Sequence, residues 1–138
     1  MCYNNSDSRI CEYNKSKEYV IAVLKKKKIK QYLEQKSEYS IFDDLLRLYI
    51  SDALQNKLQS WGLTHISIYI DWKNDYKLID LQAKCHDYFY EWQFDENECS
   101  FMVYIDNEPD EPTCLTYSMF KNVDDLLLKM KSLVPTIK

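Results

Sequence analysis

The sequence predicts an α+β fold in which helices cover an antiparallel sheet. Three observations support this fold class. A helix pattern over residues 40–61 ends at Gly62, the only glycine of the chain. Runs of apolar and polar residues then alternate between residues 64 and 117, which is the period of strands. Short polar links separate these runs, so we expect neighbouring strands to be antiparallel.

The helix over residues 40–61 carries signals at both ends. Ser40 is a good N-cap, and Asp43 can complete a capping box with it. Gly62 follows the last apolar position, where a helix end favours a left-handed residue. One face of this helix is apolar at helical spacing. That face consists of Phe42, Leu46, Tyr49, Ala53, Leu54, Leu58 and Trp61.

The N-terminal third is less regular. Residues 1–15 are polar and aperiodic, so we expect a flexible arm before a single domain over residues 16–138. Residues 16–36 predict a helix, although a strand over Tyr19–Leu24 stays open as an alternative. The lysine run 25–28 is either an anionic-surface patch or a solvated helix turn, and short runs favour the turn. The buried stripe of this helix would be Val20, Val23, Leu24, Ile29, Tyr32 and Leu33.

A meander of four to five strands is expected after Gly62. A last helix begins after Asn122, with Asp125 as its capping partner, and ends before Pro135. The acidic segment 106–112 contains two prolines and is expected to be a loop. The pattern does not indicate which face of the sheet the two N-terminal helices and the C-terminal helix cover. The expected strands are residues 64–71, 76–84, 87–94, 99–105 and 113–117.

The composition indicates an ordinary globular domain. Apolar residues make up 46% of 138 residues, which suffices for a core and excludes a disordered chain. No stretch approaches the roughly 18 apolar residues of a membrane span, and no signal peptide is visible, so we expect a cytoplasmic protein. The five cysteines form no close pair, which favours reduced thiols over a disulfide framework.

The net charge of −4 is unevenly distributed along the chain. Residues 1–60 carry 11 basic and 8 acidic side chains, a net of +3, whereas residues 61–138 carry 7 and 14, a net of −7. Between Asp71 and Glu111 there are 12 acidic side chains and three lysines, a net of −9. Such a field attracts a basic partner and repels phosphates, so nucleic acid is not an expected ligand of the sheet region.

The sequence contains no convincing catalytic, cofactor or metal motif. Cys85, His86 and Asp87 resemble a nucleophile, a base and an orienting acid, but consecutive strand residues point to opposite faces. Zinc ligation by Cys85, His86, Cys99 and Cys114 would lack the close ligand pairs of structural zinc sites. A single glycine cannot build a phosphate-binding loop. We therefore expect neither an enzyme nor a cofactor.

In its size, its acidity and its order of helix and meander, the chain resembles the immunity proteins of bacterial contact-dependent growth-inhibition and polymorphic toxin systems. The resemblance covers about residues 40–134 and rests on an amphipathic helix that ends at Trp61-Gly62, followed by acidic aromatic strands. It implies that the protein binds a cognate toxin domain, often a basic nuclease, and occludes its active site. An acidic protein can associate quickly with such a partner.

Under this hypothesis the contacts come from acidic side chains, with three aromatic residues as anchors. The aromatic residues could equally well be core residues beneath the helices. The acidic candidates are Asp71, Asp75, Asp87, Glu91, Asp95, Glu96, Glu98, Asp106, Glu108, Asp110 and Glu111, and the aromatic ones are Tyr88, Tyr90 and Trp92.

Two other functions stay open at this point. One is an acidic secretion chaperone that binds an effector segment, although such chaperones have a helix within their sheet that the pattern over residues 64–117 does not predict. The other is an enzyme centred on Cys85 and His86. The sequence also leaves open whether the protein is a monomer or a homodimer.

Overall fold

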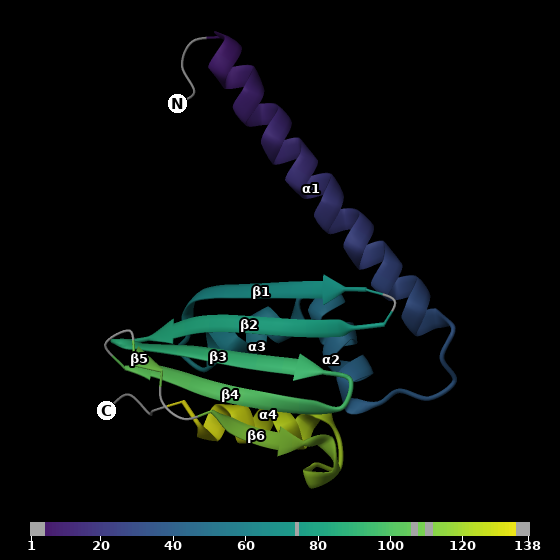
Figure 1. Ribbon diagram of the computed structural model, residues 1–138, viewed down its shortest axis with the longest axis vertical. Helices are drawn as coiled ribbons and strands as arrows, with labels where there is room; N and C mark the ends of the chain where they lie inside the picture. The colour runs from purple at the N-terminus through teal and green to yellow at the C-terminus, as the bar shows by residue number, and fades with distance from the viewer. Residues whose placement is uncertain (1–4, 74, 106–107, 110–111, 135–138) are drawn as a thin grey trace. The chain divides into compact units, whose positions relative to one another are not determined.

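The structure is a computed structural model that describes residues 5–73, 75–105, 108–109 and 112–134 (Figure 1). By its internal contacts the chain divides into two compact units, residues 1–37 and residues 38–138. The division differs from the expected boundary after residue 15. The two units also differ in charge: residues 1–37 carry nine basic and four acidic side chains, and residues 38–138 carry nine and 18.

The first unit contains one helix, α1 (Asn5–Glu34). Residues 5–15 are helical and continuous with the predicted helix. The segment Tyr19–Leu24 is helix and not strand. Of the expected buried stripe, Ile29 and Leu33 are buried, but Val20, Val23 and Leu24 are 46–52% exposed. The predicted stripe is therefore wrong over residues 20–24, where Ile21 is exposed as well.

The predicted helix over residues 40–61 is two helices, α2 (Ile41–Ile50) and α3 (Ala53–Ser60). The N-terminal prediction is confirmed: the Ser40 hydroxyl accepts from the Asp43 N–H, and the Asp43 carboxylate accepts from the Ser40 N–H. The break lies at Asp52, whose φ of 63° is left-handed. Aspartate tolerates this conformation better than most residues, so the chain turns there without interrupting the apolar spacing.

Gly62 ends α3 as predicted. Its φ is 86°, its N–H donates to the carbonyl of Gln59, and the N–H of Leu63 donates to the carbonyl of Leu58. These two bonds form a Schellman motif, and the burial of Leu58 and Leu63 supplies its usual apolar contact.

Replacing Gly62 by alanine is expected to lower the free energy of unfolding by about 1 kcal/mol, because a Cβ disfavours positive φ. Gln59→Ala, an exposed change in the same turn, is the control and should stay within about 0.5 kcal/mol of wild type. Urea denaturation measures both variants. Equal stability of the two would contradict the structural role of Gly62.

In the described residues, the second unit forms an antiparallel sheet of six strands. Four long strands form the predicted meander in the order β1-β2-β3-β4, and two short strands both pair with β4. The expected loop 106–112 contains the two-residue strand β5, whose Pro109 lies where no further strand needs its N–H. The strands are β1 (Thr64–Trp72), β2 (Lys77–Cys85), β3 (Tyr88–Asp95), β4 (Glu98–Ile105), β5 (Glu108–Pro109) and β6 (Thr113–Thr116).

The C-terminal part follows the prediction closely. A short 3-10 turn, η1 (Tyr117–Met119), replaces the last residue of the expected strand 113–117, and α4 (Val123–Ser132) follows. The Asn122 side chain accepts from the N–H of Asp125, as expected for an N-cap. The Asp125 carboxylate accepts from the N–H of Lys121. Pro135 lies outside the described residues.

The core lies between the sheet and one layer of helices. Figure 1 shows α2, α3 and α4 behind the sheet, on the same side. Beneath them Tyr90 and Trp92 stack with ring centroids 5.7 Å apart, and Phe101 lies 5.5 Å from Trp92. Fully buried helix residues that complete this core are Phe42, Leu45, Leu46, Leu54, Leu58 and Leu126. The α+β class is therefore confirmed, with three helices instead of two before the sheet.

Candidate functional site

The face of the sheet opposite α2, α3 and α4 is called the open face below. Alternation along each strand, together with the pairing register, determines which side chains it carries. It is more polar than the buried face but includes several aromatic and aliphatic groups. Most of its side chains are half-buried, whereas Tyr69 is 57% exposed. The central members are Tyr69, Leu78, Asp80, Gln82, Phe89, Glu91, Gln93, Asp95, Ser100, Met102 and Tyr104.

Glu91 occupies the centre of a hydrogen-bond network on the open face. Its Oε2 accepts from Nε2 of Gln82 on β2 at 2.9 Å, and its Oε1 accepts from the hydroxyl of Tyr104 on β4 at 3.1 Å. The three side chains therefore connect β2, β3 and β4. Both carboxylate oxygens of this half-buried side chain therefore have a hydrogen-bond donor.

Asp80 lies beside Glu91 and is less well satisfied. One of its carboxylate oxygens, Oδ1, is buried without a hydrogen-bond partner. Burial, followed by the hydrogen bond and the negative charge of Glu91, raises the pKa of Asp80 to about 6, against the lowering effect of hydrogen bonds from Gln93 and Gln82. The hydroxyl of Tyr104 responds in the same direction, since burial and the bond to Glu91 raise its pKa. Asp80, beside Glu91, is therefore a carboxyl group on the open face that loses its proton near pH 6.

The turn between β3 and β4 is held by Asp95. Its Oδ1 accepts from the backbone N–H groups of Asn97 and Glu98, both at 2.7 Å. The hydroxyl of Tyr117, from η1, donates to the backbone carbonyl of Asp95 at 2.5 Å. Burial raises the pKa of Tyr117, so this hydroxyl keeps its proton and remains a donor.

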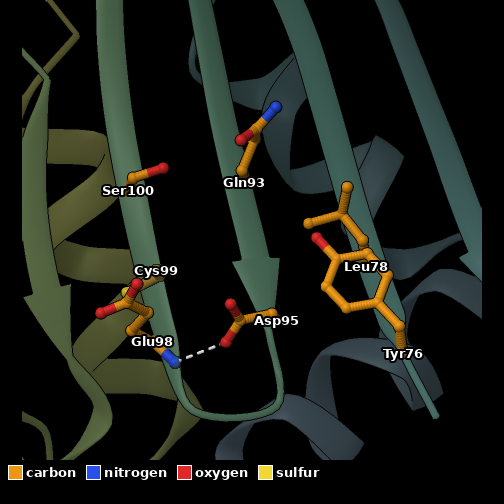
Figure 2. Close-up of a pocket in the computed structure, with 7 residues that line it drawn as sticks. All are labelled: Tyr76, Leu78, Gln93, Asp95, Glu98, Cys99 and Ser100. Carbon is orange, nitrogen blue, oxygen red and sulfur yellow. Dashed lines mark hydrogen bonds between the residues drawn. The ribbon is translucent and has the colours of Figure 1, made fainter.

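A pocket of about 110 Å³ opens on this end of the sheet (Figure 2). A second pocket of about 80 Å³ adjoins it, and Tyr76 and Asp95 belong to both. In the second pocket the ammonium of Lys77 lies 3.7 Å from a carboxylate oxygen of Glu96. The first pocket is lined by Tyr76, Leu78, Gln93, Asp95, Glu98, Cys99 and Ser100. The second is lined by Asp75, Tyr76, Lys77, Asp95, Glu96 and Asn97.

The structure brings together some of the predicted contact residues and separates others. Because the β1–β2 and β3–β4 turns lie at the same end of the sheet, five predicted acids gather there. They are Asp71, Asp75, Asp95, Glu96 and Glu98, and this set is called the acidic end below. Glu91 lies at the centre of the open face, and Asp87 lies in the turn at the opposite end. Asp106, Asp110 and Glu111 lie outside the described residues, and of Glu108 only the backbone is described.

Two of the three predicted aromatic anchors are not on the surface. Tyr90 and Trp92 are 1% and 2% exposed, because they point from β3 toward the helices. As partner contacts these two predictions are therefore wrong. Tyr88 shares their face at the end of the strand and is 36% exposed. The aromatic groups available on the open face are instead Tyr69, Phe89 and Tyr104, which the sequence did not single out.

Pattern reasoning also missed Asp80, Gln82 and Tyr104. Each occurs at an ordinary alternating position, so nothing in the local sequence marks it. They meet Glu91 only through the cross-strand register, which pairs Gln82 with Glu91 and Phe89 with Tyr104. The predicted strands 76–84 and 87–94 place the β2–β3 turn at residues 85 and 86, whereas it lies at His86 and Asp87. A turn predicted at these two residues would have given the correct β2–β3 register.

The residues considered for catalysis and for zinc do not form one cluster. Cys85 is buried at the end of β2, whereas His86 is exposed in the turn with a left-handed φ of 57°. Cys99 is buried, which raises the pKa of its thiol to about 11, and Cys114 is exposed. Among the described residues, no three His, Cys, Asp or Glu side chains are grouped so that they could hold a metal ion.

Two further findings concern the whole described chain. No helix in its described parts is long and apolar enough to cross a membrane. Comparisons with protein-family models, with curated proteins and with solved structures found no significant match. The geometry of the open face and the acidic end therefore provides the structural basis for a functional proposal.

Proposed function

We propose that this protein is an immunity protein that binds and neutralises a toxin domain with a basic surface, a nuclease being the expected class. One observation carries the proposal: the acidic end gathers five carboxylates beside two pockets, at the edge of a sheet face that no helix among the described residues from 38 to 134 covers in Figure 1. A surface of this kind suits a partner that binds phosphates, because it presents the same sign of charge.

The open face offers what a protein interface needs besides charge. Tyr69, Phe89 and Tyr104 provide aromatic area, and aromatic groups are enriched among residues that dominate binding. The Phe89 and Tyr104 rings meet edge to face with centroids 5.2 Å apart, which fixes their orientation. Carboxylates at the rim then speed association and select basic partners.

The alternative function, an acidic secretion chaperone, finds no specific support in the fold. Such chaperones have a helix within the sheet. In the described residues between 64 and 105, only strands and their connecting turns occur. An extended effector segment as partner would favour the chaperone in the experiment below.

The test combines co-expression with a charge-matched control. The toxin candidate is the C-terminal domain of the protein that the adjacent upstream reading frame encodes. Wild-type protein is expected to rescue growth of cells that express this domain and to form a stoichiometric complex with it. The triple variant Asp75→Asn, Glu96→Gln, Glu98→Gln should weaken the complex by about tenfold or more and increase its dissociation by salt.

The control triple variant is Glu38→Gln, Asp87→Asn, Asp124→Asn. It changes the net charge from −4 to −1, as the test variant does, and all six side chains are exposed. It should retain wild-type affinity. An equal loss of affinity in both variants would show that the effect depends on net charge and not on the acidic end. A complex whose affinity changes neither in the test variant nor with salt would refute the acidic end as the binding surface.

A further inference from the structure

The 110 Å³ pocket of Figure 2 differs from its neighbour in one chemical respect. In the neighbouring pocket, Lys77 supplies a cation to Glu96. The larger pocket is lined by two acidic residues, Asp95 and Glu98, and none of the seven residues that line it is basic. It therefore has the negative charge of a cation-binding site without an internal cation.

The remaining lining suits a long side chain that ends in a positive charge. Leu78 and the ring of Tyr76 provide an apolar wall, against which the methylene groups of lysine or arginine can pack. The Tyr76 ring can also attract the cation itself. Figure 2 shows the Ser100 hydroxyl pointing from β4 toward β3, where it adds an uncharged acceptor, whereas the Gln93 amide points along β3 away from Asp95.

The two carboxylate oxygens of Asp95 have different surroundings. Its Oδ1 is committed to the backbone N–H groups of Asn97 and Glu98. Figure 2 shows the second carboxylate oxygen turned away from that turn and up along the pocket, toward Gln93. The turn thus fixes the carboxylate while leaving one oxygen for a ligand, and a positioned carboxylate binds a cationic donor more strongly than a mobile one.

We infer that this pocket is a subsite for one lysine or arginine side chain of the partner, held between Asp95 and Glu98 with its stem against Leu78 and Tyr76. The inference rests on the proposed function for the identity of the partner. The chemistry of the subsite does not depend on it, so the two can be tested separately.

The experiment is an NMR titration of the ¹⁵N-labelled full chain with three probes: the N-acetyl methylamides of lysine, arginine and norleucine. Norleucine has the lysine stem without the charge. The cationic probes should shift the backbone resonances of Glu98 and Ser100 and the side-chain amide of Gln93, with a dissociation constant on the order of millimolar. The stronger of the two cationic probes identifies the preferred side chain.

Asp95→Asn is the matched variant, because an asparagine oxygen can still accept from the turn N–H groups while the charge is lost. It should weaken the cationic probes about tenfold and leave the norleucine probe unchanged. Asp87→Asn, in the turn at the other end of the sheet, should leave all three probes unchanged.

Equal shifts with norleucine, or no saturable shift with either cation, would overturn the subsite. The same holds if Asp95→Asn, verified as folded by its spectrum, binds the cations as tightly as wild type does. Probe binding without a toxin complex would support the subsite and refute the proposed function. A toxin complex without probe binding would support the proposed function and refute the subsite.

Discussion

Trp92→Ala is expected to lower the free energy of unfolding by about 3–5 kcal/mol, the cost of truncating a large buried aromatic side chain. Trp92 is 2% exposed, stacks on Tyr90 and contacts Phe101, so its removal leaves a cavity in the centre of the core. For a domain whose total stability is about 5–15 kcal/mol, this loss is a large fraction. Urea denaturation followed by circular dichroism measures it.

Tyr69→Ala is the control for this prediction. Tyr69 lies on β1 of the same sheet but is 57% exposed on the open face, so the variant should lose less than about 1 kcal/mol. The pair of variants separates the two roles of aromatic residues in this chain. If Trp92→Ala were as stable as Tyr69→Ala, Trp92 would have to be exposed, which would contradict the placement of the helices.

Asp80→Asn is expected to change how the stability of the protein depends on pH. The folded-state pKa of Asp80 is raised from 3.8 to about 6, so between these values the folded chain binds more protons than the unfolded chain. The stability is therefore fully present below about pH 4 and decreases as the pH rises through about 6. Asparagine cannot ionise and should abolish this decrease.

The size of the effect follows from the shift. A shift of this size represents about 3 kcal/mol, and screening of a half-buried pair reduces it to about 1–2 kcal/mol. Asp80→Asn should therefore be more stable than wild type by that amount at pH 8 and nearly equal to it at pH 4. Urea denaturation at a series of pH values between these limits checks the prediction.

Glu91→Gln tests the cause of the shift. Burial is the first cause, and the hydrogen bond and the charge of Glu91 are the next. Removing that charge should reduce the decrease with pH but not abolish it. Asp87→Asn, which removes an exposed carboxylate from the same hairpin, is the control for loss of a charge. An unchanged pH profile in Asp80→Asn would show that Asp80 is not the titrating group.

Local signals in the sequence predicted the ends of the elements well. Ser40, Gly62 and Asn122 each form a hydrogen bond with a residue three positions away, so a short window of sequence contains the whole interaction. The break at Asp52 has no such signal, because the apolar spacing continues from Tyr49 to Ala53 across it. The left-handed conformation of Asp52 can be recognised only in the structure and not from the neighbouring residues.

The candidate site could be predicted only in part, for a different reason. The acidic end is a property of composition and turn position, both of which the sequence displays. The network of Asp80, Gln82, Glu91 and Tyr104 depends on how three strands are aligned, and one residue of slippage would move each side chain to the other face. The burial of Tyr90 and Trp92 likewise depends on which face the helices cover.

The bond from the Tyr117 hydroxyl to the Asp95 carbonyl links the pocket to a distant part of the chain. The Asp95 carboxylate accepts from two N–H groups of its own turn. Its backbone carbonyl accepts from Tyr117 of η1, which lies 22 positions later in the sequence. A loop anchored on both sides has little conformational freedom left to lose when a ligand arrives. Its rigidity is paid during folding, so recognition at this end begins from a preorganised surface.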